Sequence, residues 1–273
     1  TNYLPVQQKG KEAELVTQFE MHTVEQLGLL KMDFLGLRNL SVIDRTLELI
    51  GDEKLDIDNI PLDDKKTFEL LADGKMTGVF QLESRVAQST SRSLKTNTFE
   101  DIVALVALIR PGPLGAGMHN EFTDRATGRK DIEYLHKDLE EILSETYGVI
   151  LYQEQVMQIA QKISGFELEE ADELRKAMGK KIPKVMEKQR EKFTIGATKN
   201  GYSEQFAIEL FDQIAYFAGY GFNKSHSVPY ALLAYQTAYL KANHPAEYIA
   251  ACLTAVKRDK DRTAIFLSEA RDL

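Results

Sequence analysis

This 273-residue chain has only one cysteine. It has no long apolar run, no internal repeat and no low-complexity tract. The single cysteine, Cys252, excludes an internal disulfide, and its apolar surroundings at 250–253 indicate a buried thiol in a reducing compartment, with the cytoplasm as the expected location. No stretch approaches the roughly 18 consecutive apolar residues that a membrane span needs, so no membrane partner is expected. The lack of any period of about 20 to 50 residues excludes a solenoid.

The charge is uneven along the chain. A net charge of −8 argues against indiscriminate binding to nucleic acid, and 43% hydrophobic residues are enough to build a real core. Between residues 175 and 193, however, eight basic side chains stand against two acidic ones. This local excess of positive charge is suited to binding a polyanionic ligand.

Helices dominate the expected fold, which is mainly α with a small mixed start. Residues 15–19 and 29–35 read as strands, the second one buried, and a boundary is expected near Arg38. Helices are predicted at 40–50, 65–72, 84–94, 99–109, 153–164, 168–178, 183–200, 204–218, 227–242, 246–256 and 262–273.

Three punctuated segments interrupt this helical series. The Arg-Pro-Gly-Pro sequence at 110–113 predicts a rigid turn, because its two prolines fix φ and cannot continue the preceding helix. The Gly-Tyr-Gly sequence at 219–221 predicts either a tight turn or a close approach of backbone or ligand. Pro229 is expected in the first turn of a helix capped by Ser227.

Two charged residues lie in the expected strand at 29–35. Because side chains alternate along a strand, Lys31 and Asp33 fall on one face. In one interpretation the Asp33 carboxylate holds a divalent metal while the Lys31 ammonium meets a phosphate. In the other, the two form an ion pair at the strand edge, and the spacing alone favours that ion pair.

The basic stretch after residue 174 also has two interpretations. It follows the acidic segment 168–173, and acidic first turns with basic last turns suit the helix dipole, so a solvated helix would have the same sequence. Yet the segment holds more cations than capping requires, and clustered cations are typical of phosphate contact. These cations are Lys180, Lys181, Lys184, Lys188, Arg190 and Lys192.

The segment 219–227 combines flexible backbone, aromatic rings, an ammonium and an imidazole before a helix N-terminus. This combination suits a nucleotide, because backbone N–H groups and Lys224 attract phosphate while Tyr220 or Phe222 can face a sugar or base. A plain helix-linking loop, with His226 as a cap, fits the same residues and is favoured without further context.

Taken together, these segments resemble the family C bacterial DNA polymerases, and the likeness is spread over nearly the whole chain. Several long strings in the family's order are far more specific than one short motif. They occur at residues 30–37, 79–84, 107–114, 147–157, 174–181 and 217–227.

The resemblance implies a role for each candidate residue. Asp33 would be the third of three palm carboxylates that hold the catalytic metals, which replaces the ion pair as the preferred interpretation. The residues expected to contact the incoming nucleotide are Lys31, Tyr152, Arg175, Lys176, Tyr220, Asn223, Lys224 and His226. Those expected to contact DNA are Arg110, Lys180, Lys181, Lys184 and Lys188.

The resemblance further implies an internal fragment of a replicative DNA polymerase. Residues 1–38 would be the C-terminal part of an α/β nucleotidyltransferase-like palm and residues 39–273 the helical fingers. The expected substrates are deoxynucleoside triphosphates and primer-template DNA, with Mg²⁺ in a two-metal site. The parent's sliding clamp, proofreading exonuclease and clamp-loader partners would bind mostly through other regions.

Two departures from the family pattern affect these expectations. The family commonly has two arginines where this chain has Arg175 and Lys176, and a lysine lacks the forked geometry for bidentate phosphate contact. The family's paired palm aspartates, in a Pro-Asp-x-Asp-x-Asp-Phe string, do not occur in this sequence. One carboxylate cannot fix two metals about 3.5–4 Å apart, so the isolated chain is expected to be inactive.

Two other classes of function fit parts of the sequence. The basic stretch alone would support a non-catalytic helical nucleic-acid-binding module, with salt-sensitive DNA binding that does not depend on nucleotide. The many amphipathic helices and the acidic balance would support a helical protein-interaction scaffold. Neutralising Lys31, Arg175 and Lys224 would leave polymerase activity unchanged if the scaffold interpretation were correct.

Overall fold

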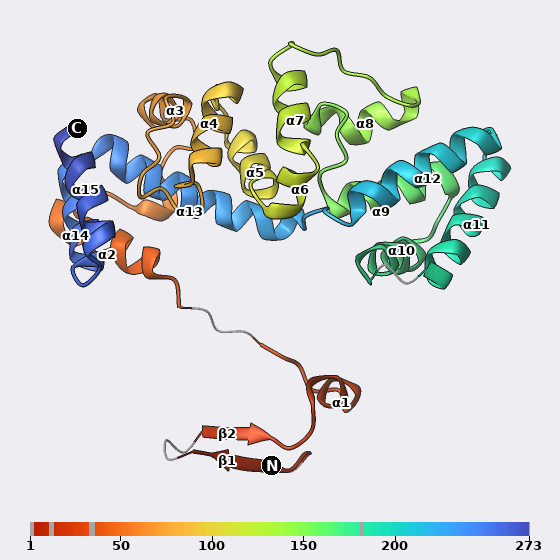
Figure 1. Ribbon diagram of the computed structural model, residues 1–273, viewed down its shortest axis with the longest axis horizontal. Coiled ribbons are helices and arrows are strands. Elements are labelled where there is room, and N and C mark those ends of the chain that lie inside the picture. Colours follow the sequence, from red (N-terminus) through yellow and green to blue (C-terminus); the bar gives the residue numbers. More distant parts are fainter. Residues whose placement is uncertain (1–2, 11–13, 33–35, 181–182, 273) are drawn as a thin grey trace. The chain divides into compact units, whose positions relative to one another are not determined.

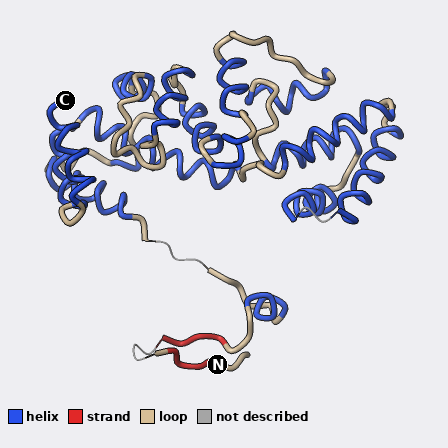
Figure 2. Tube along the Cα trace, viewed as in Figure 1, coloured by secondary structure: helices blue, strands red, loops and turns tan. Residues whose placement is uncertain are grey.

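The computed structural model describes residues 3–10, 14–32, 36–180 and 183–272 (Figure 1). The chain divides into two compact units, Thr1–Arg38 and Asn39–Leu273, and each is described by itself. Figure 2 shows the two strands in the first unit and helices throughout the second. The fold is therefore mainly α with a small sheet near the N-terminus, as the sequence predicts.

The described residues of the first unit form one antiparallel strand pair and one short helix. Strands β1 (Val6–Lys9) and β2 (Glu14–Thr17) are paired with Val6 opposite Thr17. Helix α1 (Met21–Gln26) begins after Glu20, whose carboxylate accepts hydrogen bonds from the backbone N–H groups of His22 and Thr23. A two-stranded sheet buries little apolar surface and has little stability of its own.

The strand expected at 29–35 is wrong for the residues that the structure describes. Residues 29–32 form no strand, and Leu30 and Met32 are 85% and 66% exposed. A strand needs neighbours to pair its backbone N–H and C=O groups, and among the described residues the only sheet is the β1–β2 pair. Residues 33–35, with Asp33, lie outside the described residues.

The second unit is built from helices joined by short loops and single 3₁₀ turns. Between their helices lie the 3₁₀ turns η1 (Ile57–Asn59), η2 (Lys137–Leu139) and η3 (Ser144–Thr146). The helices are α2 (Arg38–Ile50), α3 (Lys65–Ala72), α4 (Arg85–Leu94), α5 (Phe99–Leu108), α6 (Pro111–Gly115), α7 (Met118–Ala126), α8 (Glu140–Leu143), α9 (Gln153–Ser164), α10 (Leu168–Lys180), α11 (Pro183–Lys199), α12 (Glu204–Ala218), α13 (Lys224–Asn243), α14 (Pro245–Val256) and α15 (Lys260–Asp272).

Two details of the predicted helices are wrong. The preceding helix ends at Leu108, before the Pro-Gly-Pro segment, as predicted, but the segment forms the start of α6 instead of a rigid turn, because proline at the first helical position loses no hydrogen bond. Helix α13 begins at Lys224, earlier than expected, because Asn223 caps it by accepting from the backbone N–H of His226. Pro229 therefore lies inside this helix rather than in its first turn.

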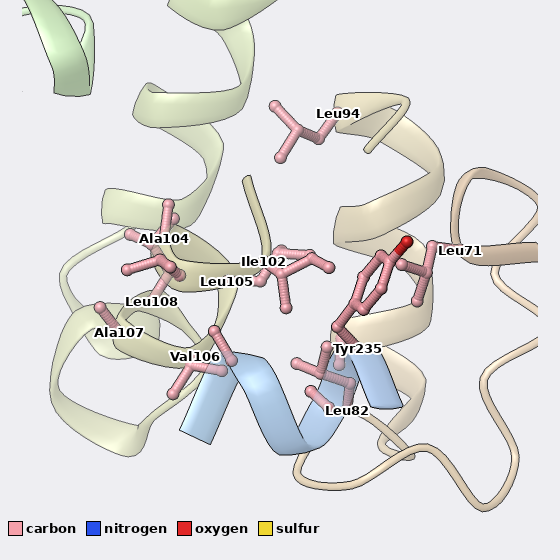
Figure 3. Packing of buried hydrophobic residues seen from close by; sticks show 14 of the residues in the cluster. Leu71, Leu82, Leu94, Ile102, Ala104, Leu105, Val106, Ala107, Leu108 and Tyr235 are labelled. Atoms are coloured by element: carbon pink, nitrogen blue, oxygen red, sulfur yellow. The ribbon is translucent and has the colours of Figure 1, made fainter. Parts of the chain in front are cut away.

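Helix α5 is the centre of the first hydrophobic core. Residues 102–108 are all buried, as expected for a helix that is apolar on every side. Helix α13 packs along it, and α3, α4 and α7 complete the surroundings (Figure 1). The side chains of Leu71, Leu82, Ile102 and Tyr235 lie together in this core (Figure 3).

A second core lies between α9, α10, α11 and α12. Ile159, Leu174, Phe193 and Leu210 are fully buried within it. Helices α9 and α11 approach so closely that a Cβ at Gly196 would lie 2.2 Å from the Ser164 carbonyl oxygen. The glycine is required at this crossing, because a real Cβ atom would collide with backbone.

A third cluster joins α14 and α15 to α2 and to the C-terminal part of α13. Tyr248 and Cys252 are buried in it. Lys241 of α13 is also fully buried, and its ammonium donates to the carbonyls of Lys75 and Thr77 and pairs with Glu269 at 2.5 Å. Among the described helices, none is both long and apolar enough to cross a membrane.

Candidate functional site

The starts of α9 and α13 are joined by main-chain hydrogen bonds. The backbone N–H of Phe222 donates to the Leu151 carbonyl at 3.1 Å, and that of Gln153 donates to the Phe222 carbonyl at 2.9 Å. Tyr152 and Phe222 thereby form a short parallel bridge between segments about 70 residues apart. This junction, which we call the α9–α13 junction (residues 151–154 and 220–224), contains four of the eight candidate nucleotide contacts, namely Tyr152, Tyr220, Asn223 and Lys224.

The N-terminus of α13 is already satisfied by protein groups. The Asn223 side chain caps it, and the Glu154 carboxylate accepts from the backbone N–H of Lys224 at 2.9 Å and of Ser225 at 3.4 Å. These are the N–H groups that the sequence suggested for phosphate. The negative charge of Glu154 interacts favourably with the positive end of the helix dipole, and its carboxylate therefore stabilises the contact between α9 and α13.

Lys224 reaches back over the junction. Its ammonium pairs with Glu145 at 2.5 Å and lies 5.3 Å from the centroid of the Tyr152 ring. Tyr152 is only 3% exposed, and this burial raises the pKa of its hydroxyl, which therefore stays protonated at neutral pH. Tyr152 thus offers an aromatic face to a cation rather than a charge to a metal.

Arg175 of α10 contacts the same junction through Gln153. Its guanidinium pairs with Asp172 at 2.8 Å and donates to the Gln153 side-chain oxygen at 3.3 Å. Gln153 in turn donates from its amide nitrogen to the Gly221 carbonyl at 3.2 Å. Lys176, one residue on, is exposed and pairs with the other oxygen of Asp172 at 2.7 Å. Hydrogen bonds from Lys176 and then Arg175 hold the pKa of Asp172 below its usual range.

Arg110 holds the loop before α13. Its Nε donates to the Ala107 carbonyl at 2.9 Å, its Nη2 donates to the Tyr220 carbonyl at 2.8 Å, and its guanidinium lies over the Phe222 ring. Burial lowers the pKa of Arg110 from its ordinary value. The Tyr220 ring packs so close to Gly112 that a Cβ there would lie 2.5 Å from it. The contact of Arg110 with DNA stays a prediction.

His226 lies in the first turn of α13 and is exposed. Its ring is 4.4 Å from the ring centroid of Tyr230 and 5.6 Å from that of Phe222. The three rings form an aromatic row that runs from the loop before α13 onto its first turns. Such a row is suited to stacking against a base or a sugar.

The basic stretch divides into paired and unpaired cations. Arg190 pairs with Asp212 at 2.6 Å and Lys192 with Glu170 at 2.7 Å, so these two stabilise contacts between helices. In the described part of the chain, the exposed side chains of Lys184 and Lys188 form no ion pair. Lys181 and the side chain of Lys180 lie outside the described residues.

The two predicted palm residues belong to the first unit. Lys31 is exposed, and Asp33 lies outside the described residues, so the expected meeting of both with Arg175 and Lys224 stays a prediction. Within the described residues, no three His, Cys, Asp or Glu side chains are grouped to hold a metal ion. The metal role of Asp33 stays a prediction.

Comparison with known proteins identifies the family. A family model described as the bacterial DNA polymerase III alpha subunit finger domain matches residues 39–201. The chain belongs to this family. A second model, described as the bacterial DNA polymerase III alpha NTPase domain, matches residues 1–36 of the same chain. The boundary between the two matches lies beside the division between the two compact units.

Curated DNA polymerase III alpha subunits match over nearly the whole chain. That of Escherichia coli K12 is 51% identical over 275 residues, covering 96% of this chain and 23% of the relative. Those of Mycobacterium tuberculosis H37Rv and Pseudomonas aeruginosa PAO1 are 46% and 48% identical, and each match covers the full chain and 24% of the relative. The chain thus spans about a quarter of the length of the DNA polymerase III alpha subunits it matches.

Sequence reasoning selected the cations of the α9–α13 junction but missed the groups that hold them. Glu145, Gln153, Glu154 and Asp172 were not expected at the site. Two sequence signals exist: acidic and amide side chains are common at helix starts, as at Gln153 and Glu154, and Asp172 stands at helical spacing from Arg175 and Lys176. The partners of Glu145, Gln153 and Glu154 lie about 20 to 80 residues away, and no local pattern links them.

Proposed function

We propose that this chain is part of a replicative DNA polymerase that transfers a nucleotidyl group from a deoxynucleoside triphosphate to a primer 3′ hydroxyl. Residues 39–273 act as the fingers and bind the incoming nucleotide at the α9–α13 junction. Residues 1–38 act as the end of the palm. The main support is the convergence of Arg175, Lys224 and Tyr152, from three different helices or their caps, on one junction in a member of the polymerase III alpha family.

The junction offers the chemistry that a nucleotide needs. Arg175 keeps guanidinium donors beyond those used by Asp172 and Gln153, and Lys224 supplies a compact ammonium, so both can neutralise phosphate charge. Phe222 and His226 present aromatic faces beside them. Lys176, which pairs with Asp172, and Asn223, which caps α13, are proposed as secondary contacts.

The metal chemistry is assigned to the palm. Asp33 would supply one carboxylate to a two-Mg²⁺ site, with Lys31 beside it contacting the nucleotide and the remaining ligands coming from outside this chain. Bound there, the two ions would stabilise the attacking and leaving oxygens of the transfer. A chain with one such carboxylate lacks a complete site, so it is proposed to be inactive alone.

Primer-template DNA is the proposed second substrate. Lys184 and Lys188, both exposed on α11, together with Lys180 and Lys181, would bind its phosphates, and Arg110 would do so near the junction. The sliding clamp, the proofreading exonuclease and the clamp loader are proposed partners of the parent protein, mostly through other regions. Neutralising any one of these lysines should weaken DNA binding and reduce its salt dependence.

The experiment replaces the two cations in the full-length polymerase. Arg175→Gln and Lys224→Gln should each raise KM for the incoming nucleotide about 10- to 100-fold, the usual range for a hydrogen bond to a charged group. Lys162→Gln is the matched control, because Lys162 pairs with Glu141 and neither residue belongs to the junction. Equal KM values for all three variants would contradict the proposal.

The rival function is a non-catalytic nucleic-acid-binding module, favoured by the exposed pair Lys184 and Lys188. It predicts that Asp33→Ala in the full-length protein leaves primer extension intact. The polymerase proposal predicts a loss of at least about 1,000-fold from removing a metal ligand, several kcal/mol of transition-state stabilisation. Primer extension by the purified variant separates the two.

A further inference from the structure

Lys224 is engaged by a carboxylate where the proposed function requires a phosphate. Its ammonium lies 2.5 Å from Glu145 Oε2, and Glu145 belongs to the 3₁₀ turn η3, 79 residues earlier in the chain. Each partner is partly exposed, at 38% for Lys224 and 45% for Glu145. Water and a ligand can therefore reach the pair, which is not sealed in the interior.

The position of Glu145 is set by buried neighbours. The Thr146 hydroxyl, 1% exposed, donates to the Val149 carbonyl at 2.6 Å and accepts from the Gln155 side chain at 2.8 Å. The Gln155 amide also lies 3.5 Å from Glu145 Oε1. The carboxylate is thus held facing Lys224 by a turn that is anchored to the start of α9.

The backbone of Lys224 is equally well held. Its N–H donates to the Glu154 carboxylate, and Phe222, two residues earlier, forms the bridge to α9. Only the flexible side chain is left to move. The ammonium can therefore exchange partners by rotating its four-carbon stem, without any shift of α13.

Arg175 differs from Lys224 in this respect. Its partner Asp172 lies three residues earlier on the same helix, and its guanidinium has donors left over for a phosphate. A lysine ammonium is a point charge, and a phosphate bound to it would lie close to the Glu145 carboxylate. Either Lys224 leaves Glu145 or two negative charges are brought together, and both weaken nucleotide binding.

We propose that Glu145 is an internal competitor for the incoming triphosphate: it holds the Lys224 ammonium in the nucleotide-free molecule and must give it up when the nucleotide binds. This inference rests on the proposed function and adds a residue that positions Lys224 without touching the nucleotide. Glu145 restrains affinity, so its removal should improve binding. Few structural residues would have that effect.

The test measures nucleotide affinity in the full-length polymerase on a primer that lacks a 3′ hydroxyl, so that binding is separated from chemistry. The probe is the next complementary deoxynucleoside triphosphate. Glu145→Gln should lower its Kd about two- to five-fold, the range expected for releasing a partly exposed ion pair. Glu145→Ala, which removes the same charge with a different shape, should shift Kd in the same direction.

Two further variants show that the effect passes through Lys224. In a Lys224→Gln background, Glu145→Gln should leave Kd unchanged, because the cation it held is gone. Glu141→Gln is the matched control, since Glu141 of α8 pairs with Lys162 of α9 and not with Lys224. Its Kd should equal that of the parent.

Each other outcome overturns the inference. A Kd for Glu145→Gln that is unchanged or higher shows that Glu145 does not compete. If Glu145→Gln lowers Kd just as much in the Lys224→Gln background, or if Glu141→Gln lowers Kd by the same factor, the change is a general effect of charge. If Lys224→Gln alone leaves Kd unchanged, the nucleotide assignment fails with it, whereas a weaker Kd for Lys224→Gln without tightening by Glu145→Gln refutes the competitor alone.

Discussion

The guanidinium carbon of Arg110 lies 4.2 Å from the centroid of the Phe222 ring. Arg110 precedes α6 and follows the buried helix of the first core, while Phe222 bridges to α9 and leads into α13. Two hydrogen bonds from the same guanidinium to the Ala107 and Tyr220 carbonyls add to the stacking. One side chain therefore fixes the loop that carries the candidate nucleotide contacts.

Replacing Arg110 tests this role. Arg110→Ala should lower the free energy of unfolding of the chain by about 2–3 kcal/mol, because two carbonyls no longer have a charged donor and the cation–π interaction is removed. Arg110→Lys should restore less than half of that stability, since an ammonium cannot stack and donate as a planar fork. Urea unfolding measures both. A lysine variant as stable as the parent would show that only the charge matters.

Gly196 and Gly179 form a matched pair of helical glycines. Gly196→Ala should destabilise the chain by about 2–3 kcal/mol, because the new Cβ collides with the Ser164 backbone and must push α9 and α11 apart. Gly179→Ala meets nothing within 4 Å and should be neutral or stabilising by up to about 1 kcal/mol. The thermal unfolding midpoint should fall in Gly196→Ala and stay the same or rise in Gly179→Ala, each relative to the parent. Equal destabilisation in both would contradict the close helix crossing.

Cys252 is expected to be chemically inert in the folded chain. It is 4% exposed, and burial raises the pKa of its thiol to about 12, so almost none is thiolate at pH 8. Alkylation of the native chain should be slower than that of the unfolded chain by a factor on the order of 1,000. Because the chain has one cysteine, mass spectrometry reports this site directly. Similar rates with and without urea would contradict the buried position.

Glu121 should give the chain a measurable pH dependence. Hydrogen bonds from Lys130 and then Arg125, both at 2.7 Å, hold the pKa of Glu121 below its ordinary value of 4.5. A depressed carboxyl pKa stabilises the folded state above pH 4.5, and this stabilisation is lost as the pH falls through the folded pKa. Glu121→Gln should therefore cost about 1 kcal/mol at pH 7, after allowing for its partial exposure, and less at lower pH.

The control for that experiment is Glu69→Gln. Glu69 forms a single, widely exposed ion pair with Lys65 at 3.7 Å, so its replacement should change stability by less than about 0.5 kcal/mol at any pH. Chemical unfolding from pH 7 down to well below pH 4.5 compares the two variants with the parent. A constant difference for Glu121→Gln over this range and below would argue against the ionic origin of the effect.

Local sequence patterns were sufficient to predict the long helices and to recognise the family. The punctuation around α9 and α12 predicted their bounds, because caps, glycines and apolar periodicity act within a few residues. The same reasoning failed at residues 29–32, where a strand depends on pairing partners that a local pattern does not supply. It also missed α6, because Pro111 begins a new helix directly after the predicted end of α5.

For the candidate site, too, the sequence predicted one part and the tertiary structure decided the other. The identities of Arg175, Tyr152 and Lys224 could be selected from the sequence, because each stands in a motif of the family. That Lys224 is paired with Glu145 and Arg175 with Gln153 followed only from packing, because helices distant in the chain are brought together by the two cores beneath them. Residue type sets what a side chain can bind, whereas long-range packing selects its partner.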